Sequence, residues 1–527
     1  MNHFYERNSY LLNHEVNRTF EELLWMSQDD FRTWVREMRQ VVIHAWDNLG
    51  LPPRVGYDEQ DIIDQFDKMM GFPVHKFLVK DELTGEHNLI RNTSVIGNAA
   101  NQWFPTMMST RINYTANDDG YSIHDWFEKE DLYERFVKYA HRHFKRDGFY
   151  HYSLPVRAAD AENFLFHSRS GQDWIEQFEA KERQYARSDY WIAPKQPDTG
   201  YTGYNEELKN QVWLTLTRAE VDSLNIPDKC KSNIDAIGET DTYQIRYYEY
   251  GHKVFPVGLK AFRVSFCQYA VNFPPLTAKY LYEKYTEHIP RDQEQVVVYD
   301  PSAGWGGRIL GAMSVRDDRS IHYVGTDPNT DHIIDEGQRT KYEDLAEFYN
   351  TRTTRGRSLF PHTNTYEIYR LGSECIGSDP EFQRHRGKVD VCFTSPPYWA
   401  KEAYSDDPTQ SYKKFTVYRD WVEGFLRPTL ETAVEWLNHD RYLLWNIADA
   451  KFGKDMLPLE QDSQDILESL GMEYVETMKM TLAQMPGGNR IDTETGLPRA
   501  KNFCKISNKA GKDIFLKYEP ISVWIKR

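Results

Sequence analysis

Apolar and polar positions alternate along the second half of the chain in a way that predicts strands and helices in turn. Short apolar runs typical of buried strands occupy 296–299, 321–325, 366–371, 389–393 and 442–447. Helical spacing covers 308–315, 331–348, 421–437 and 463–470, and Thr330 is the predicted N-cap of the second of these helices. Two further runs, 473–483 and 520–526, predict a closing antiparallel pair. The pattern as a whole predicts an α/β fold with a doubly wound, Rossmann-like sheet.

The first 260 or so residues have a different pattern. Helical spacing predominates there over 21–49, 58–70 and 123–144, with Pro and Gly breaks between these segments. We find no internal repeat and no tract of low complexity. Because 527 residues exceed the usual size of one domain, the chain is predicted to hold a mainly helical N-terminal domain, 1–265, and an α/β domain, 266–527.

Charge and cysteine content exclude some classes of protein. The formal net charge of -16 and the pI of about 5.6 argue against a broadly basic surface, although a local basic face is enough for brief contact with DNA. The five cysteines are scattered without a C-x-x-C pair, which disfavours a disulfide framework and a zinc ribbon. No segment has the ~18 apolar residues of a membrane span. We therefore expect a cytoplasmic protein, bacterial or virus-encoded and acting in the host cytoplasm, without a membrane partner.

A glycine-rich turn follows the first predicted strand, in the sequence Asp300-Pro-Ser-Ala-Gly-Trp-Gly-Gly307. Glycine reaches positive φ at little cost and lets the backbone pass close to a ligand, which makes Gly304 and Gly306 candidates for a cofactor loop. Asp327 stands at the end of the next predicted strand, where dinucleotide folds place a carboxylate that receives ribose hydroxyls.

A second loop, Thr394-Ser-Pro-Pro-Tyr-Trp399, follows the predicted strand at 389–393. Together the two loops resemble those of the S-adenosylmethionine-dependent methyltransferases that modify exocyclic amino groups of DNA bases. The resemblance covers about 272–527 and implies a seven-stranded class I methyltransferase sheet. It also implies S-adenosylmethionine as the cofactor and double-stranded DNA as the partner.

The resemblance also implies which residues bind the cofactor. Asp300 would lie near the amino group of the methionine part, above the glycine loop, and the segment 272–279 would close over the methionine tail. The segment 371–374, after the third strand, would border the adenine ring. The candidate cofactor residues are Phe273, Pro274, Asp300, Ser302, Gly304, Gly306, Asp327, Ser373 and Thr394.

The second loop carries the predicted chemistry. The lone pair of an exocyclic amino nitrogen is delocalised into the base, and two hydrogen-bond acceptors can localise it for attack on the methyl group. Ser395 Oγ and the Pro396 carbonyl are the candidate acceptors, and Pro396 and Pro397 have no N–H of their own. Tyr398 would stack on a base flipped out of the duplex. The sequence does not decide whether Trp399 extends this stacking surface or packs in the core.

The sequence leaves the substrate open. Serine at the first motif position is, within the resembled family, commoner for cytosine N4, and the alternative is adenine N6. Methylation at carbon 5 of cytosine would need a Pro-Cys nucleophile loop, and no Pro-Cys dipeptide occurs in the chain. The acceptor could also be an amine in RNA or in a small molecule, or the chain could be a DNA-binding protein with an inactive methyltransferase domain. A second reaction in the N-terminal domain has no motif in its support.

Target recognition is assigned to the N-terminal domain by elimination, because neither interval around the two loops holds a large additional domain. Cations and aromatic residues interleave there over 138–146, which is typical of a surface that follows a nucleic-acid backbone, although a solvated helix face has the same pattern. Further candidates for phosphate contacts are Arg352, Arg355, Arg357, Lys413 and Lys414. We expect no metal, because the histidines show no pair with zinc-ligand spacing. The oligomeric state is not predicted.

Overall fold

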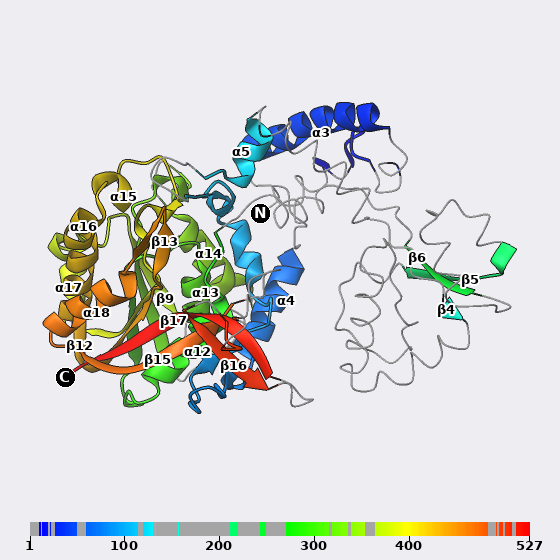
Figure 1. Ribbon diagram of the computed structural model, residues 1–527. Helices are drawn as coiled ribbons and strands as arrows, with labels where there is room; N and C mark the ends of the chain where they lie inside the picture. Colours follow the sequence, from blue (N-terminus) through cyan, green and yellow to red (C-terminus); the bar gives the residue numbers. More distant parts are fainter. Residues whose placement is uncertain are drawn as a thin grey trace.

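The computed structural model (Figure 1) describes two long parts of the chain and several short stretches. The long parts are 27–49, 59–113 and 120–129 near the N-terminus, and 270–315, 319–335, 339–353, 364–482, 501–507 and 513–527 in the second half. The short stretches are 10–11, 13–18, 22, 132, 156–157, 211–219, 243–248, 492 and 495–498. The predicted domain boundary near 265 lies outside the described residues and stays a prediction.

A mixed, mostly parallel sheet forms the centre of the second half. Five parallel strands lie in the order β9-β8-β7-β10-β12. Their bounds are β7 (Gln295–Asp300), β8 (Ser320–Thr326), β9 (Thr365–Tyr369), β10 (Val389–Thr394) and β12 (Leu437–Asn446). Each contains one of the five predicted apolar runs or most of it. The order begins at β7, runs outward through β8 to β9, and returns on the other side of β7 with β10. A Rossmann-type sheet has this reversal at its ligand-binding point.

The predicted closing pair is confirmed. The long strand β17 (Asp513–Lys526) is antiparallel to β12 and to β15 (Glu473–Thr481). Three more strands extend the sheet: β16 (Phe503–Ser507) pairs with β17, β2 (Leu89–Ile90) pairs with β15, and β1 (Leu78–Val79) pairs with β2. Within the described residues the sheet therefore has ten strands, and the predicted count of seven is not confirmed.

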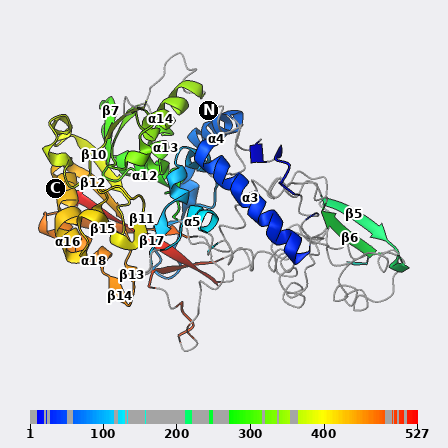
Figure 2. The ribbon, with the colours of Figure 1, turned by 90° about the horizontal axis from the view of Figure 1, so that it is seen from above.

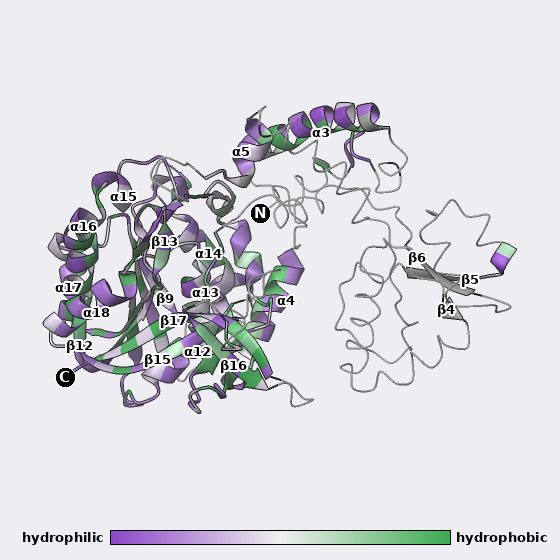
Figure 3. Ribbon diagram, in the orientation of Figure 1, coloured by the Kyte–Doolittle hydropathy of each residue, from purple (hydrophilic) through white to green (hydrophobic). Residues whose placement is uncertain are grey.

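Helices cover both faces of this sheet (Figures 1 and 2). One face carries α12 (Pro275–Thr286), α13 (Gly307–Met313), α14 (Lys341–Arg352) and α4 (Glu59–Met70). The other carries α16 (Tyr418–Trp421), the π-helical turn η11 (Val422–Leu426), α17 (Arg427–Trp436) and α18 (Leu459–Ser469). Figure 3 shows hydrophobic residues along the strands and hydrophilic ones on the outer helices, so each face is covered by one apolar layer.

The prediction of a helix over 331–348 capped by Thr330 is wrong in its first half. Residues 330–332 form a 3₁₀ turn, η6 (Thr330–His332), capped by Asn329, and the chain then folds back through a bridge between Ile333 and Thr340. The helix α14 begins only at Lys341. Thr340 is its N-cap, in a capping box with Glu343. The sequence holds two plausible caps ten residues apart, and the second has the reciprocal Glu that favours a helix start.

The N-terminal half joins the core of the sheet domain. Its described elements are α3 (Gln28–Leu49), α4, η1 (Val74–Phe77), β1, β2, η2 (Asn98–Gln102), η3 (Pro105–Met108), β3 (Arg111–Ile112), α5 (Ile123–Glu128), β4 (Val156–Arg157), β5 (Gln211–Leu216) and β6 (Tyr243–Tyr248). Strands β4, β6 and β5 form a separate sheet, and a predominance of helix is not confirmed. The buried ammonium of Lys279 on α12 donates to the carbonyls of Met69 (2.8 Å) and Met70 (2.7 Å), and so caps the C-terminal end of α4.

The remaining short elements lie in the second half. They are η8 (Ile376–Ser378), η9 (Phe382–His385), η10 (Trp399–Lys401), β11 (Glu402–Ala403), α15 (Ser411–Lys414), and the hairpin β13 (Ala450–Phe452) with β14 (Asp455–Leu457). Strand β11 pairs with β3, so the residues that follow the second loop are bonded to the N-terminal half. Among the described helices, none combines the length and the apolarity that a membrane crossing requires.

The contact between α12 and α13 has no room for an added methyl group at Gly311. A Cβ there would lie 2.6 Å from Ala278 Cβ and 2.8 Å from the Pro275 carbonyl oxygen. We expect Gly311→Ala to lower the free energy of unfolding by about 1–3 kcal/mol, the usual cost of overpacking. Gly71→Ala is the matched control, because its Cβ would meet nothing closer than 4.0 Å. That variant should be neutral or gain up to about 1 kcal/mol. Urea unfolding of both variants measures the difference, and equal stabilities would contradict the helix contact.

Candidate functional site

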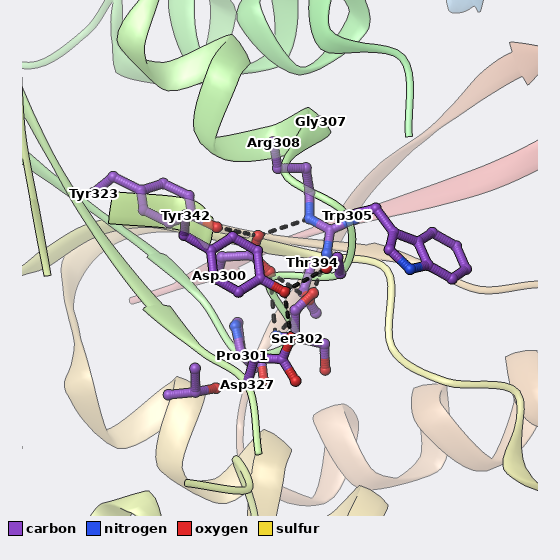
Figure 4. Close-up of polar contacts among 12 residues, drawn as sticks. Asp300, Pro301, Ser302, Trp305, Gly307, Arg308, Tyr323, Asp327, Tyr342 and Thr394 are labelled. Atoms are coloured by element: carbon purple, nitrogen blue, oxygen red, sulfur yellow. Dashed lines mark hydrogen bonds and ion pairs between the residues drawn. The ribbon is translucent and has the colours of Figure 1, made fainter. Parts of the chain in front are cut away.

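One buried carboxylate organises the ends of three strands. Asp300, the last residue of β7, is fully buried, and all its hydrogen-bonding capacity is directed at the protein (Figure 4). Its Oδ2 accepts from Arg308 Nε (2.8 Å) and from the Tyr323 hydroxyl (2.6 Å). Its Oδ1 accepts from the Thr394 hydroxyl (2.7 Å) and from the Ser302 backbone N–H (3.2 Å). Asp300 therefore fixes the start of the glycine-rich turn relative to the neighbouring strands.

The two loops singled out in the sequence lie side by side. Thr394 is the last residue of β10, and its buried hydroxyl donates to Asp300 and accepts from the Ser302 N–H at 3.1 Å. One side chain thus ties the start of the glycine loop to the residue that precedes Ser395. The parallel pairing of β7 and β10, with Cys392 opposite Tyr299, brings these ends together. This is the point where the strand order reverses, and open α/β sheets bind their ligands there.

The glycine loop has the backbone conformation predicted for it. Gly304 has φ +63° and Gly306 has φ +76°, values that favour glycine over any other residue. A Cβ on Gly306 would lie 2.4 Å from the Phe104 ring, and one on Gly307 would lie 2.1 Å from the Phe273 carbonyl oxygen. Both glycines therefore allow close approach by other parts of the protein. Gly304 is the more open position, with Arg308 Nη2 at 3.4 Å as the nearest atom.

Residues upstream of the first strand clamp this loop. The Asn272 side chain donates to the Trp305 carbonyl (2.7 Å), and its Oδ1 accepts from the Gly307 N–H (3.2 Å). Phe273 is buried edge-on against Phe393. Pro274 is the N-cap residue of α12. The start of the segment 272–279 therefore lies against the glycine loop, and its predicted closure over a methionine tail stays a prediction.

Asp327 lies just past the end of β8, half-buried, with its carboxylate held on one side. Oδ2 contacts His332 Nδ1 (2.7 Å) and the Tyr342 hydroxyl, and Oδ1 accepts from the Asn329 N–H at 2.9 Å. The other ring nitrogen of His332 contacts the Thr106 hydroxyl at 2.8 Å, so the N-terminal half supports this carboxylate. Burial first, and then the charge of Asp327, raise the pKa of Tyr342 well above its usual value, and its hydroxyl stays protonated.

The second loop presents its motif residues in different environments. Pro396 is buried, and Ser395 and Pro397 are half-buried. Within the described part of the chain the Ser395 hydroxyl makes no hydrogen bond, so it is available to a ligand. The Tyr398 hydroxyl donates to Glu519 and accepts from the Ala448 N–H (3.0 Å), which fixes the ring.

Trp399, which the sequence left open, belongs to the core. It is 8% exposed, and its indole N–H donates to the Phe415 carbonyl at 3.0 Å. Its ring packs edge-on against Tyr418 and Phe452. Cys392, inside β10, is fully buried.

The loop after β9 contains an acceptor that sequence reasoning did not single out. The Ser373 hydroxyl is buried against Thr429 of α17 at 2.8 Å. Next to it, Glu374 Oε1 accepts from Lys414 Nζ (2.7 Å), whereas Glu374 Oε2 is buried without a hydrogen bond. An unsatisfied buried carboxylate oxygen is costly, and it is the kind of atom that a ligand amino group would satisfy.

The predicted phosphate contacts are only partly described. Lys413 pairs with Asp406 (3.1 Å), Lys414 with Glu374, and Arg352 with Glu59 (3.0 Å). These three cations are therefore already engaged by acidic groups of the chain. The segment 138–146, Arg355 and Arg357 lie outside the described residues.

One group of side chains in the described residues has the composition of a metal site. His322 and His385 both direct Nε2 at Glu367, at 3.3 and 2.9 Å, and the ligand atoms lie within 4.8 Å of one another. Arg384 Nη2 also contacts Glu367, at 2.5 Å, and supplies the positive charge that this carboxylate requires. Burial raises the pKa of Glu367, but the hydrogen bonds from His322, His385 and Arg384 outweigh it and hold this pKa far below its usual value. The group is thus a self-contained ion-pair cluster, and we assign no metal to it.

Comparison with known proteins assigns no family. No protein-family model matches the chain, and no curated protein matches it. Among solved structures, a precorrin-6y C5,15-methyltransferase from Geobacter metallireducens is 11% identical over 47% of this chain and 87% of that one, with a TM-score of 0.25. A didemethyltoxoflavin N1-methyltransferase from Burkholderia thailandensis with bound S-adenosylhomocysteine is 10% identical over 47% and 76%, with a TM-score of 0.23.

A third structure, from Thermus thermophilus, carries a provisional assignment as a DNA modification methylase. It is 18% identical over 29% of this chain and 49% of that one, with a TM-score of 0.18. Identities and TM-scores this low define neither the family nor the activity of the chain. The description of the fold therefore rests on its own strand order.

Removal of Arg308 should expose how much the site depends on the Asp300 ion pair. Arg308→Met leaves a carboxylate without its cation at a fully buried position, and we expect a loss of about 3–5 kcal/mol in the free energy of unfolding. The exposed pair Arg427 and Glu423 provides the control, since Arg427→Met should cost at most about 1 kcal/mol. In chemical denaturation, Asp300→Asn combined with Arg308→Met should lose less than the sum of the two single changes. Additive losses would show that the pair is not coupled.

Proposed function

We propose that this protein transfers a methyl group from S-adenosylmethionine to an exocyclic amino group of a flipped-out DNA base. The observation that carries the proposal is the hydrogen-bonded contact of the two loops through Asp300, Thr394 and Ser302. It brings a glycine-rich strand end and a loop of amine-directed acceptors to the same switch point of the sheet. Transfer by direct displacement requires the methyl donor and the amine to be held together in this way.

The residues present fit S-adenosylmethionine. Gly304 leaves the loop backbone open to a ligand at positive φ. Asp327 stands past the end of β8 as an acceptor for ribose hydroxyls, and its partners His332 and Tyr342 fix its direction. Glu374 Oε2 is an unsatisfied acceptor at the end of β9, where it would receive the adenine amino group. When bound there, the cofactor supplies a sulfonium methyl group.

The second loop supports the amine side of the reaction. Ser395 Oγ lies one residue past the Thr394 anchor without a hydrogen bond to the described residues, and the Pro396 carbonyl is the second acceptor. Two acceptors directed at the two N–H groups localise the nitrogen lone pair toward the methyl group. The ring of Tyr398, held by its hydroxyl, is a fixed surface on which a base would stack.

Cytosine N4 is the proposed target, on the basis of serine at the first motif position, and adenine N6 is the alternative. Binding of DNA without methyl transfer would instead support an inactive methyltransferase domain. We assign target recognition to the N-terminal half, which contacts the site through β3, Phe104 and Thr106.

A single experiment tests the proposed function. The protein is incubated with labelled S-adenosylmethionine and unmethylated DNA, and the digested nucleosides are identified by mass spectrometry. We expect N4-methyl-2′-deoxycytidine as the labelled nucleoside. Labelled N6-methyl-2′-deoxyadenosine would change the target base only. The absence of label in DNA, with transfer to RNA or to a small amine, would refute the proposed substrate.

Ser395→Ala should separate binding from turnover. The change removes an acceptor used at the reacting nitrogen, so we expect kcat to fall at least about tenfold with nearly unchanged cofactor affinity. Ser378→Ala, the same change on an exposed turn, is the control and should leave both quantities unaltered. Equal losses of binding and turnover in the Ser395 variant would contradict this role.

Asp327→Asn should weaken cofactor binding. The amide keeps the shape of the side chain but loses the charge, and charge-assisted hydrogen bonds are about twice as strong as neutral ones. We expect the cofactor affinity to fall by about tenfold in calorimetry, with a small change in Tm. Asp335→Asn, at an exposed neighbouring position, is the control. Unchanged affinity in the Asp327 variant would remove Asp327 from the ribose site.

A further inference from the structure

Two glutamates lie beside the second loop, and neither has a chemical role in the reaction described so far. Glu402 follows the loop in β11 and accepts, through Oε2, from the Tyr404 hydroxyl. Glu519 lies in β17 and accepts, through Oε1, from the hydroxyl of Tyr398. Each carboxyl is thus held by one tyrosine, and one of these tyrosines belongs to the motif.

Both carboxyls have their second oxygen open. Within the described part of the chain neither glutamate forms an ion pair, and neither second oxygen makes a hydrogen bond. These oxygens are also absent from the set of fully buried, unsatisfied atoms, so they keep some contact with solvent although both residues are half-buried. A carboxylate without a cation in such a place is expensive to maintain for structure alone.

The position of Glu402 places it between the two loops. Its partner Tyr404 packs edge-on against Trp305 of the glycine loop, with ring centroids 5.5 Å apart. Glu402 also lies only four residues after Tyr398, the tyrosine of the second loop. The pairing of β11 with β3 fixes the position of its backbone. Figure 4 shows the Trp305 side chain pointing away from the Asp300 network. Glu402 therefore lies near both the glycine loop and the second loop, whereas Glu519 contacts the hydroxyl end of Tyr398.

The surroundings of Glu402 and Glu519 favour the protonated form of both carboxyl groups. Burial raises the pKa of Glu402, and the charge of Glu519 raises it further, against the Tyr404 hydrogen bond and the charge of Lys401. Burial likewise raises the pKa of Glu519. The Tyr398 hydrogen bond and the charge of Lys517 act against this effect on Glu519. Tyr398 and Tyr404 also face the pair; burial and these glutamates raise their pKa values well above the usual one, so they stay neutral. A general base works best when its pKa is near the working pH.

We propose that Glu402 is the proton acceptor of the reaction, through Oε1, at the amino nitrogen that Ser395 and Pro396 orient. The inference rests on the proposed function and adds a residue to it. Glu519 acts on Glu402 through its charge, and Tyr404 acts through its hydrogen bond, so both are positioning residues.

The atoms and charges of the step balance without a further reactant. The nitrogen lone pair forms the bond to the methyl carbon, and the electrons of the broken carbon–sulfur bond stay on sulfur, which becomes a neutral thioether. As this bond forms, the N–H bond that Glu402 Oε1 shares with one of the two loop acceptors breaks: its proton passes to Oε1, and its electron pair stays on nitrogen. Glu402 becomes a neutral acid, and it returns the proton to solvent through its exposed oxygen.

The first test needs neither methyl donor nor DNA. Infrared difference spectra of the full chain are recorded during a pH titration, in which a neutral carboxyl has its own stretching band. We expect a band that titrates above the usual range of glutamate and is lost in Glu402→Gln. Glu519→Gln removes a negative neighbour and should shift the band to lower pH. Tyr404→Phe removes a hydrogen bond to the carboxylate and should shift it to higher pH.

The second test follows the pH dependence of methyl transfer under single-turnover conditions. Because Glu402 must be deprotonated to accept a proton, the rate of the wild type should rise with pH through the pKa of Glu402 and then level off. Glu402→Gln should lose this acid limb and at least about 100-fold in rate, the lower range for general-base catalysis, with cofactor affinity changed less than about twofold. The acid limb should move down in Glu519→Gln and up in Tyr404→Phe. Glu423→Gln, an exposed glutamate, is the control and should match the wild type.

The outcomes separate this inference from the proposed function. Wild-type transfer to DNA with an unchanged pH profile in Glu402→Gln overturns the role of Glu402 and leaves the proposed function standing. Shifts of the acid limb in the same direction in Glu519→Gln and Tyr404→Phe also overturn it, because a structural effect does not distinguish the two changes. No transfer to DNA by the wild type overturns both.

Discussion

The charge of Asp300 is the constraint on which the centre of the molecule depends. A carboxylate removed from water is stable only when a cation and further donors replace its hydration. Asp300 receives these from Arg308, Tyr323, Thr394 and the Ser302 backbone, which belong to α13, β8, β10 and the glycine loop. Because one side chain is bonded to all four, the ends of three strands cannot move independently. The position of the residue after Thr394 is thereby fixed relative to the glycine loop.

Much of this arrangement could be predicted from the sequence, because it depends on local patterns of residues. The five parallel strands are apolar runs, and Gly304 and Gly306 mark the turn that needs positive φ. The prediction of a helix directly after Asp327 was wrong because Asn329 caps a short 3₁₀ turn that begins at Thr330, and a β-bridge follows before α14. The apolar spacing of 331–348 carries no sign of this bridge.

The partners that complete the site could not be predicted, because they are distant in sequence. Thr106 and Phe104 reach His332 and Gly306 from more than two hundred residues away. Tyr398 meets Glu519 across 121 positions. Such contacts depend on the register of whole elements, and a single sequence does not encode register in any local signal. Even the extension of the sheet by β1 and β2 came from two dipeptides too short to be recognised as strands.

The carboxylates of the site fall into two groups by their partners. Asp300 is paired with a guanidinium, whereas Glu402 and Glu519 are held by phenol hydroxyls that add no positive charge. A neighbouring arginine favours the ionised form of a carboxylic acid. A neutral donor orients the carboxyl group and leaves it able to gain or lose a proton. Tyrosine is suited to the second task because burial raises its pKa and keeps its hydroxyl protonated. The same protein therefore has one acid that serves as a fixed anchor and others free to exchange protons.

The pairing of β2 with β15 limits how the chain can be divided. A fragment that starts after residue 265 would lose this neighbour and leave the backbone groups of β15 unpaired at an open edge, where strands of separate molecules associate. It would also lose the aromatic ring next to Gly306 and the two carbonyls that accept hydrogen bonds from Lys279. The two halves of the chain are thus expected to fold and to be expressed as one unit, with the N-terminal half as part of the framework of the sheet domain.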